Sequence, residues 1–333
     1  MTSLAPHLTA FLLERLPRER QASPHTCDAY AYAFQLLLAF ASKRLRTQPS
    51  SLSLEQLDVP LVLAFLDDLE TTRGNGARTR NARLAAIKSF ARFIEFRVPS
   101  SVQQAHSLLA VPSKKTDEKL VGYLTRDEMQ AVLDAPNPRG RDGVRDRAML
   151  HLAFAAGLRV SELVGLRLDD LELQPQPAIH VRGKGRRERV LPLWKTTAKA
   201  LRAWLAIRGP AACPELFLNA RRGPLTRDGF EHILAKHVKI AGATTPSLKK
   251  KRVSPHVLRH SCAMHTLEAT RDIRKVALWL GHATVQTTEI YVRADPSAKL
   301  EAINAVLPPG LRRGRFRAPD KLLAALRPSR NGQ

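Results

Sequence analysis

The chain has 333 residues, a length typical of two domains or one large one, and its hydrophobic content of 44% is enough for a packed core. Lys and Arg together number 54 against 30 Asp and Glu, so the formal net charge is +24, and phosphate polymers are the commonest partners of such basic chains. No apolar stretch approaches the roughly 18 residues that span a bilayer, and the first 20 residues lack a secretion signal, so neither a membrane protein nor a secreted protein is expected.

The chain has three cysteines, Cys27, Cys213 and Cys262. An odd number at such wide spacing is no disulfide framework and fits a reducing compartment, so we expect a cytoplasmic protein. An anionic membrane surface and a ribosomal partner remain alternatives to a nucleic acid as the reason for the charge.

The first hundred residues predict a helical domain, which we assign to residues 1–105. Apolar side chains recur there with the period of an amphipathic helix, and turns containing Pro or Gly separate the segments. Ser53, with Gln56 three residues later, predicts the start of the third helix. The four helices expected are Leu8–Leu16, Thr26–Ser42, Leu54–Leu69 and Thr79–Phe96.

A linker is expected next. The stretch 98–121 contains two prolines and a short polar run, and we assign residues 106–121 to the connection between two domains. A new helix is expected to begin near Thr125, because Asp127 and Glu128 would lie in its first turn, at the positive end of the helix dipole.

The hydrophobic period changes from helix to strand and back in the second half of the chain. Two β-like runs, Ala178–Val181 and Arg189–Leu193, flank the basic, glycine-containing segment Arg182–Glu188 and predict a hairpin. Gly157 is expected to end the preceding helix in a left-handed conformation. The helices expected are Val144–Ala156, Val160–Leu166, Ala198–Ile207, Arg227–Ala241, Pro255–Ala269, Ile273–Gly281, Thr284–Val292 and Asp320–Leu326. The sequence therefore predicts a mainly α fold with a small β hairpin, an α+β class.

One polar cluster lies at the start of a predicted helix. His256 and Arg259 are three residues apart on one helix face, which alone is typical of a polar exposed face or a capped helix start. His256 and His260 also have the spacing of a zinc pair, but the metalloprotease pattern needs Glu where Val257 stands, and no third ligand is evident. No metal site is therefore expected here.

Two further segments present polar side chains at glycine turns. Arg159 opens a predicted helix, where a fixed guanidinium can clamp an anion and Glu162 can hold a basic group; a surface ion pair is the alternative. His282 follows the second turn, and Tyr291 comes nine residues later, where a core aromatic is the alternative.

Together these residues form the set that metal-free phosphoryl transfer requires. Arginines neutralise the non-bridging oxygens of the transition state. An alcohol nucleophile forms a covalent intermediate, and a positioned acid protonates the leaving oxygen. The candidates are Arg159, Lys184, His256, Arg259, His282 and Tyr291.

The chain resembles the tyrosine recombinases of the phage integrase family. The matching segments lie within residues 122–307, which we assign to a catalytic domain, and the N-terminal helices resemble the core-binding, SAM-like domain of the same family. The motifs, in the order and spacing of the family, are AGLRVSEL with Arg159, RGKGRRERVLPL with Lys184, SPHVLRH with His256 and Arg259, and LGHATVQTTEIY with His282 and Tyr291.

The resemblance implies a covalent reaction on DNA. Tyr291 would be the nucleophile that attacks a scissile phosphate and forms a 3′-phosphotyrosyl link. Lys184 would protonate the departing 5′ oxygen, and His256 would help proton transfer at the nucleophile. No metal or other cofactor would be needed, because the covalent link stores the energy of the phosphodiester.

The resemblance also assigns the surrounding residues. Arg159, Arg259 and His282 would stabilise the oxygens of the transition state. Glu162 would orient Arg159, and His260 would support the helix that carries it. The enzyme expected is a site-specific recombinase or integrase that cleaves and rejoins DNA strands.

The implied architecture is a C-shaped clamp on double-stranded DNA, assembled as a homo- or hetero-tetramer on two DNA sites. The chain as a whole resembles transposon-associated integrases, so movement of a mobile element, together with other recombinases of the same element, is the expected context. The basic tail, residues 308–333, would bind phosphates or dock on a neighbouring protomer. The DNA contacts expected from the first domain, unless these side chains are ordinary solvated charges, are Arg78, Arg80, Arg83 and Lys88.

Three other functions share part of this pattern. A type IB topoisomerase uses a similar set of residues but rejoins the same strand, and the separate N-terminal domain favours the recombinase. A DNA-binding relic would be free to lose Tyr291 or Lys184, and both are present. A metal-dependent integrase needs a cluster of carboxylates at metal spacing. The sequence offers the adjacent pair Asp169 and Asp170, for which a surface pair at the exit of a helix is the simpler account.

Overall fold

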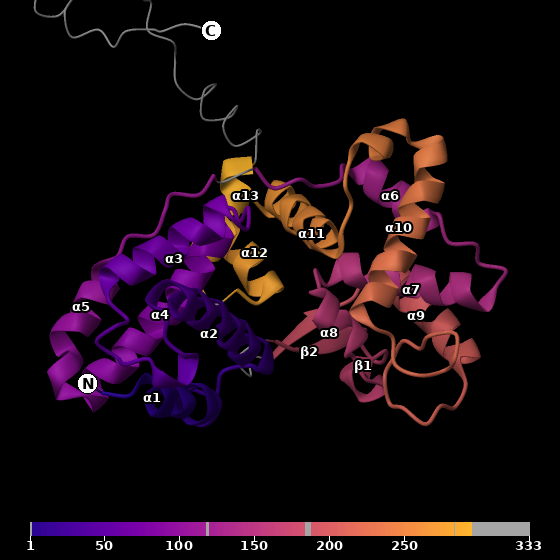
Figure 1. Ribbon diagram of the computed structural model, residues 1–333. Coiled ribbons are helices and arrows are strands. Elements are labelled where there is room, and N and C mark those ends of the chain that lie inside the picture. Colours follow the sequence, from indigo (N-terminus) through magenta and orange to yellow (C-terminus); the bar gives the residue numbers. More distant parts are fainter. Residues whose placement is uncertain (1, 118–119, 184–187, 283, 295–333) are drawn as a thin grey trace, which may run out of the picture. The chain divides into compact units, whose positions relative to one another are not determined.

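The computed structural model describes residues 2–117, 120–183, 188–282 and 284–294 (Figure 1). The chain divides into two compact units, Met1–Glu118 and Lys119–Gln333. The described residues are mainly helical with one small antiparallel sheet, which confirms the predicted α+β class. No helix among them is long and apolar enough to cross a membrane.

Phenylalanine rings form the centre of the N-terminal unit. Phe11, Phe34 and Phe90 are buried and meet edge to face, with ring centroids 5.4 to 6.1 Å apart. Each such pair contributes about 0.5–1.5 kcal/mol beyond the burial of its area. The helices of this unit are α1 (Leu4–Ala10) with its π-helical continuation (Phe11–Glu19), α2 (Pro24–Leu45), α3 (Val59–Thr71), α4 (Ala77–Arg97) and α5 (Val102–Ala110).

The predicted start of the third helix was wrong. Gln56 Oε1 accepts a hydrogen bond from the backbone N–H of Ser53 (2.9 Å), but this closes a turn and not a helix. Helix α3 begins later, where Asp58 Oδ1 accepts a hydrogen bond from a backbone N–H of the first helical turn (2.8 Å). Pro60 in that turn lacks an N–H and has a preset φ, so the helix starts more favourably after Asp58 than after Ser53.

Helix α5 occupies part of the stretch expected to be a linker. Ala105 and Leu108 are fully buried in the core of the N-terminal unit, and the Gln104 side chain donates a hydrogen bond to the carbonyl of Leu57 (2.8 Å). Residues 106–110 therefore belong to the helical unit, and their assignment to the linker was wrong. A helix of two turns with two anchoring positions is too short to show a reliable hydrophobic period.

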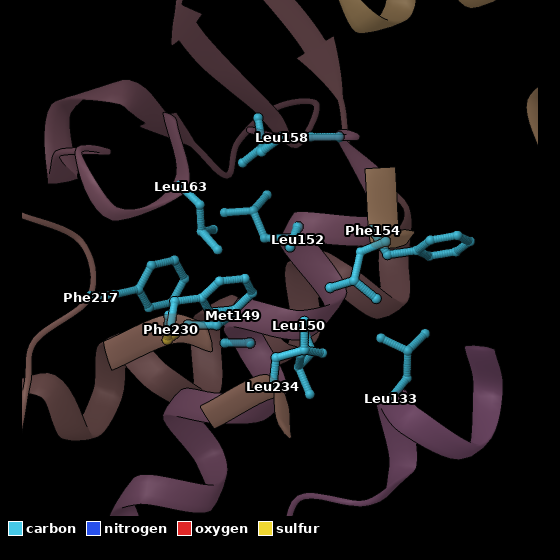
Figure 2. Close-up of a cluster of buried hydrophobic side chains, with 14 of the residues drawn as sticks. Leu133, Met149, Leu150, Leu152, Phe154, Leu158, Leu163, Phe217, Phe230 and Leu234 are labelled. Atoms are coloured by element: carbon cyan, nitrogen blue, oxygen red, sulfur yellow. The ribbon is translucent and has the colours of Figure 1, made fainter. Parts of the chain in front are cut away.

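Helix α7 (Arg141–Ala155) forms the centre of the C-terminal unit. Its residues 148–153 include four fully buried positions, and a helix that is apolar all round must be covered on every side. Figure 2 shows Phe217, Phe230 and Leu234 gathered beside Met149. The other helices of this unit are α6 (Arg126–Asp134), α8 (Val160–Val164), α9 (Lys195–Arg208), α10 (Arg227–Thr244), α11 (Pro255–Thr270), α12 (Ile273–Leu280) and α13 (Glu289–Ala294).

The predicted hairpin is confirmed as part of a three-stranded antiparallel sheet in the order β1-β2-β3. Its strands are β1 (Leu171–Glu172), β2 (Ala178–Arg182) and β3 (Glu188–Pro192), with Val181 opposite Arg189. β1 was not predicted, since two residues carry no period. The hairpin tip at 184–187 lies outside the described residues.

The left-handed turn at Gly157 is also confirmed, with φ of +55°. A Cβ at this position would lie 2.7 Å from Leu280 Cδ2, so a side chain here would displace Leu280 in addition to straining the backbone. The single helix predicted over Thr284–Val292 was wrong in part, because a 3-10 turn, Val285–Thr288, precedes α13. The predicted helix Asp320–Leu326 lies outside the described residues.

The packing of α12 allows a matched test of the core. Leu280 is fully buried, and Leu278 on the same helix is 79% exposed. Leu280→Ala is expected to lower the free energy of unfolding by about 2–5 kcal/mol because it leaves a cavity, and Leu278→Ala by less than about 0.5 kcal/mol. Denaturant unfolding followed by circular dichroism measures both losses. Equal losses would contradict the orientation of the helix.

Candidate active site

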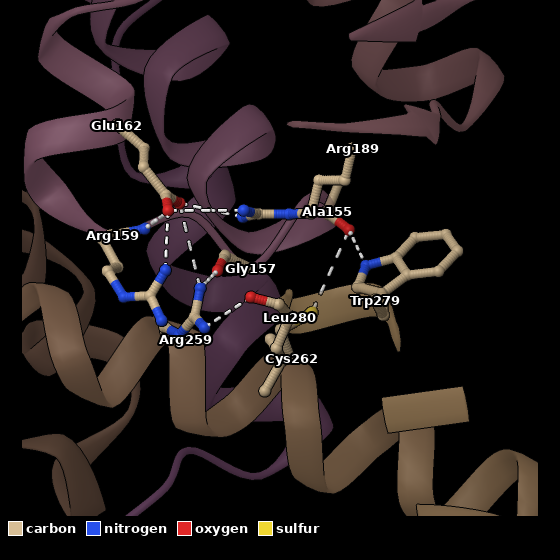
Figure 3. A network of polar contacts seen from close by, with 9 residues as sticks. All are labelled: Ala155, Gly157, Arg159, Glu162, Arg189, Arg259, Cys262, Trp279 and Leu280. Atoms are coloured by element: carbon tan, nitrogen blue, oxygen red, sulfur yellow. Dashed lines mark hydrogen bonds and ion pairs between the residues drawn. The ribbon is translucent and has the colours of Figure 1, made fainter. Parts of the chain in front are cut away.

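A buried carboxylate, Glu162, faces three guanidinium groups (Figure 3). Its Oε1 accepts a hydrogen bond from Arg159 Nη1 (2.7 Å), and its Oε2 accepts one from Arg189 Nη2 (2.8 Å). Arg259 Nη1 lies 3.9 Å from the same Oε2. Three cations around one anion leave a net positive charge of two at this place, which suits an anionic ligand.

The start of α8 fixes the position of Glu162. The backbone N–H of Arg159, the residue before the helix, donates a hydrogen bond to Glu162 Oε2 (3.0 Å). A carboxylate in the first turn also interacts favourably with the helix dipole. Burial raises the pKa of Glu162, but hydrogen bonds from Arg189 and Arg159 outweigh this and hold it below its ordinary value. Glu162 is therefore ionised at neutral pH.

Arg259 links three segments from within the protein. It lies on α11, is 4% exposed, and donates hydrogen bonds to the carbonyls of Gly157 (2.5 Å) and Leu280 (2.7 Å). The left-handed turn at Gly157 and the end of α12 thus meet at one guanidinium. Burial, reinforced by the neighbouring charge of Arg159, lowers the pKa of Arg259 to about 10, so the group stays cationic at neutral pH.

Tyr291 on α13 lies beside this cluster and is 1% exposed. Its Oη is 3.0 Å from His260 Nδ1, and its ring stacks on that of His282 with centroids 6.4 Å apart. Burial raises the pKa of Tyr291 to about 12, so its hydroxyl keeps its proton at neutral pH.

The two histidines in contact with Tyr291 are neutral at pH 7. Burial, followed by the effects of His256 and Arg259, lowers the pKa of His260 to about 4. Burial and the nearby arginines lower the pKa of His282 to about 4 as well, and its Nδ1 is 2.8 Å from Thr288 Oγ1. With its proton on Nε2, His260 accepts the hydrogen bond of the Tyr291 hydroxyl at Nδ1.

The structure brings most of the predicted site residues together. Those that lie in this cluster are Arg159, Glu162, Arg259, His260, His282 and Tyr291. His256 is exposed one turn before His260, with ring centroids 6.4 Å apart, and does not share its hydrogen bond to Tyr291. Lys184 lies outside the described residues.

Arg189 is a member of the cluster that sequence reasoning missed. It lies on β3 at the same face as the buried Leu191, since side chains two apart point to the same side of a strand. A charged residue on the inward face of an alternating strand needs a buried partner, and this is the signal that could have found it.

The acidic pair considered for a metal has a structural use. Asp170 Oδ2 accepts a hydrogen bond from the backbone N–H of Arg167 (2.9 Å), and its other oxygen lies 3.5 Å from Arg182 Nη2. Among the residues that the structure describes, no group of three or more His, Cys, Asp or Glu side chains is placed to hold a metal ion.

Two family matches cover most of the chain. Residues 122–298 match the Phage integrase family, and residues 9–97 match the family described as Phage integrase, N-terminal SAM-like domain. The chain belongs to the phage integrase family. The predicted identity as a site-specific tyrosine recombinase is thereby confirmed.

Two relatives of the integrase align with it in sequence along nearly their whole length. One relative is a protein of Sinorhizobium fredii (strain NBRC 101917 / NGR234) that bears the name integrase/recombinase y4rC. It is 46% identical to this chain over 324 residues, which cover 97% of this chain and 98% of the relative. The chain is 35% identical over 301 residues to tyrosine recombinase XerC of Myxococcus xanthus, covering 88% and 94%.

Solved structures show the same fold. XerH recombinase bound to its palindromic difH substrate aligns with a TM-score of 0.67 and 22% identity, covering 89% of this chain and 84% of that one. A lambda integrase tetramer bound to a Holliday junction aligns with a TM-score of 0.60 and 17% identity, covering 87% and 77%. At such low identities the likeness concerns the fold alone.

The neutral state of His260 can be tested by titration. Its pKa of about 4 is below the ordinary value of 6.5, so the unfolded chain binds a proton at this ring before the folded chain does. The free energy of unfolding is therefore expected to fall as the pH decreases from 6.5 toward 4, and to fall less steeply in His260→Asn. Denaturant unfolding at each pH measures the slopes, and nitrogen-15 NMR follows the ring. A His260 ring that gains its proton above pH 6 would contradict the arrangement.

Proposed function

We propose that this integrase cleaves and rejoins DNA through a covalent 3′-phosphotyrosyl intermediate on Tyr291. The supporting observation is the meeting of a protonated tyrosine, a neutral histidine at hydrogen-bond distance from it and a cationic cluster at one place. A phosphodiester is the substrate that this combination fits, because the arginines bind its anionic oxygens and the tyrosine supplies an alcohol nucleophile.

In the proposed step one proton leaves the attacking oxygen of Tyr291, and another is added to the departing 5′ oxygen. Tyr291 Oη attacks phosphorus as its proton passes to His260, and the exposed His256 takes part in carrying it to solvent. The bond from phosphorus to the 5′ oxygen breaks, and Lys184 supplies the proton to that oxygen. The free 5′ hydroxyl of a partner strand then attacks the phosphotyrosine and rejoins the DNA.

Three groups would bind the non-bridging oxygens. Arg159 donates a hydrogen bond to Glu162 through one terminal nitrogen, and its side chain is 34% exposed. It can therefore bind a phosphate while it keeps its hydrogen bond to Glu162. Arg259 and His282 would complete the site from α11 and from the turn after α12. The desolvation of these groups strengthens their interaction with a phosphate that displaces water.

Double-stranded DNA is the proposed partner, with residues 122–307 carrying the chemistry. The DNA-bound complexes among the structures of the same fold support this proposal. Arg83 would contact phosphate while its guanidinium lies 4.8 Å from the Tyr32 ring centroid. Arg80 would not, because it is buried and lies 3.6 Å from Glu70. We further propose a tetramer on two DNA sites and, as the context, movement of a mobile element.

Covalent trapping tests the proposed function. The protein would be incubated in a chelator with nicked DNA from the ends of its own genetic element, and run on a denaturing gel. The wild-type chain is expected to form a slow protein–DNA band, and Tyr291→Phe to bind the DNA without forming one, because the nucleophilic oxygen is gone.

Tyr30→Phe is the matched control, since Tyr30 packs against Phe11 in the N-terminal unit and should keep the band. An adduct in Tyr291→Phe, or a strict need for Mg²⁺, would refute the assignment. Relaxation of supercoiled DNA without exchange between two sites would point to a type IB topoisomerase instead.

A further inference from the structure

Arg189 has no role in the reaction proposed above, although both of its terminal nitrogens donate hydrogen bonds to Glu162. Its Nη2 donates to Oε2 (2.8 Å) and its Nη1 to Oε1 (3.3 Å), so the two planar groups meet as a fork. The side chain is 10% exposed. A fork of this kind holds both partners in one orientation, which a lysine could not do.

Arg189 and Arg259 approach the same oxygen of Glu162. Arg189 Nη2 lies at hydrogen-bond distance from Oε2, and Arg259 Nη1 lies just beyond that distance, at 3.9 Å. The hydrogen bonds of Arg259 go instead to two backbone carbonyls, those of Gly157 and Leu280. The carboxylate is therefore held by Arg189 and Arg159, and Arg259 lies beside it as a third cation that is not hydrogen-bonded to it.

A buried carboxylate that loses a cationic partner draws in the nearest remaining one, because an unpaired charge in a protein interior is costly. Without Arg189, Arg159 still holds Oε1 (2.7 Å), and the nearest cation that is not yet hydrogen-bonded to Glu162 is Arg259. Arg259 needs to move by only about 1 Å to reach hydrogen-bond distance from Oε2. Such a move would take Arg259 away from the carbonyls that orient it.

Arg189 also lies under the turn that presents His282. A Cβ on Gly281 would be 3.0 Å from Arg189 Nη1 and 3.1 Å from its Cδ, so the turn packs directly on this side chain. Gly281 has a φ of +63°, which only glycine adopts without strain. One arginine thus contacts both Glu162 and the segment that leads to His282.

We propose that Arg189 is a positioning residue: by occupying Glu162 it keeps Arg259 on the carbonyls of Gly157 and Leu280, in the position in which Arg259 binds the scissile phosphate. The inference rests on the proposed function, in which Arg259 binds a phosphate oxygen. Arg189 itself does not touch the substrate in this account.

The test compares Arg189→Met, Glu162→Gln and the double variant in single-turnover cleavage of nicked DNA. Arg189→Met is expected to slow cleavage by about 10²-fold, the effect of a displacement of roughly 1 Å in a site. DNA binding and folding should change little. The double variant is expected to be faster than Arg189→Met alone, because an uncharged glutamine in place of Glu162 no longer attracts Arg259.

Arg182→Met is the matched control. Arg182 lies on the neighbouring strand, is 67% exposed and pairs with Asp170, so its loss removes one charge from the same hairpin without freeing Glu162. Adding Glu162→Gln to Arg182→Met should not make cleavage faster than in Arg182→Met alone. A double variant of Arg189 and Glu162 that is no faster than Arg189→Met would overturn the proposal, since it would make Arg189 a residue of structural support only.

A crystal structure of Arg189→Met, without DNA, separates this proposal from the proposed function. The proposal predicts that Arg259 Nη1 hydrogen-bonds to Glu162 Oε2 and that the bond from the same nitrogen to the carbonyl of Gly157 is lost. An Arg259 that has not moved would overturn it. Absence of a covalent adduct in the wild-type chain would instead refute the proposed function and leave this geometric test in force.

Discussion

The site depends on one buried carboxylate with more cations around it than it can neutralise. Glu162 collects Arg159 from the start of α8, Arg189 from β3 and Arg259 from α11, so three separate elements meet at one anion. A carboxylate in such a place is tolerable only when its hydrogen bonds are complete. The positive charge left over is held in a fixed place, and a bound phosphate can neutralise it without rearranging the protein.

The reacting groups beside this cluster are kept neutral by the same burial. A deprotonated tyrosine or a charged histidine would be poorly solvated there, and the arginines oppose a charge on His260 and His282. The resting site therefore combines fixed cations with neutral proton donors and acceptors. In the proposed reaction, negative charge enters only with the phosphate, and the proton of Tyr291 has an acceptor in contact before the attack begins.

The sequence was enough to predict Arg159, Arg259, His282 and Tyr291 as candidates, because their motifs combine turns with unusual polar residues. The pairing of Glu162 with Arg159, three residues away, was also predicted, but the contacts between distant segments were not. Arg189 meets Glu162 across 27 residues, and His260 meets Tyr291 across 31, so these contacts exist only after the elements have packed. Local patterns also predicted the wrong helix start where two residues could begin the helix, as at Ser53 and Asp58. They missed elements that are too short to show a hydrophobic period, as in β1 and α5. Tertiary contacts decide such cases.

The most direct measurement of the central claim is the identity of the atom that joins protein to DNA. Adduct formed on nicked DNA would be digested with protease and nuclease, and the linked peptide sequenced by mass spectrometry. The account predicts a single modified peptide that carries a nucleotide on Tyr291, with the phosphate attached to the 3′ oxygen of the sugar. A nucleotide on any other residue, or a link through a 5′ phosphate, would contradict it.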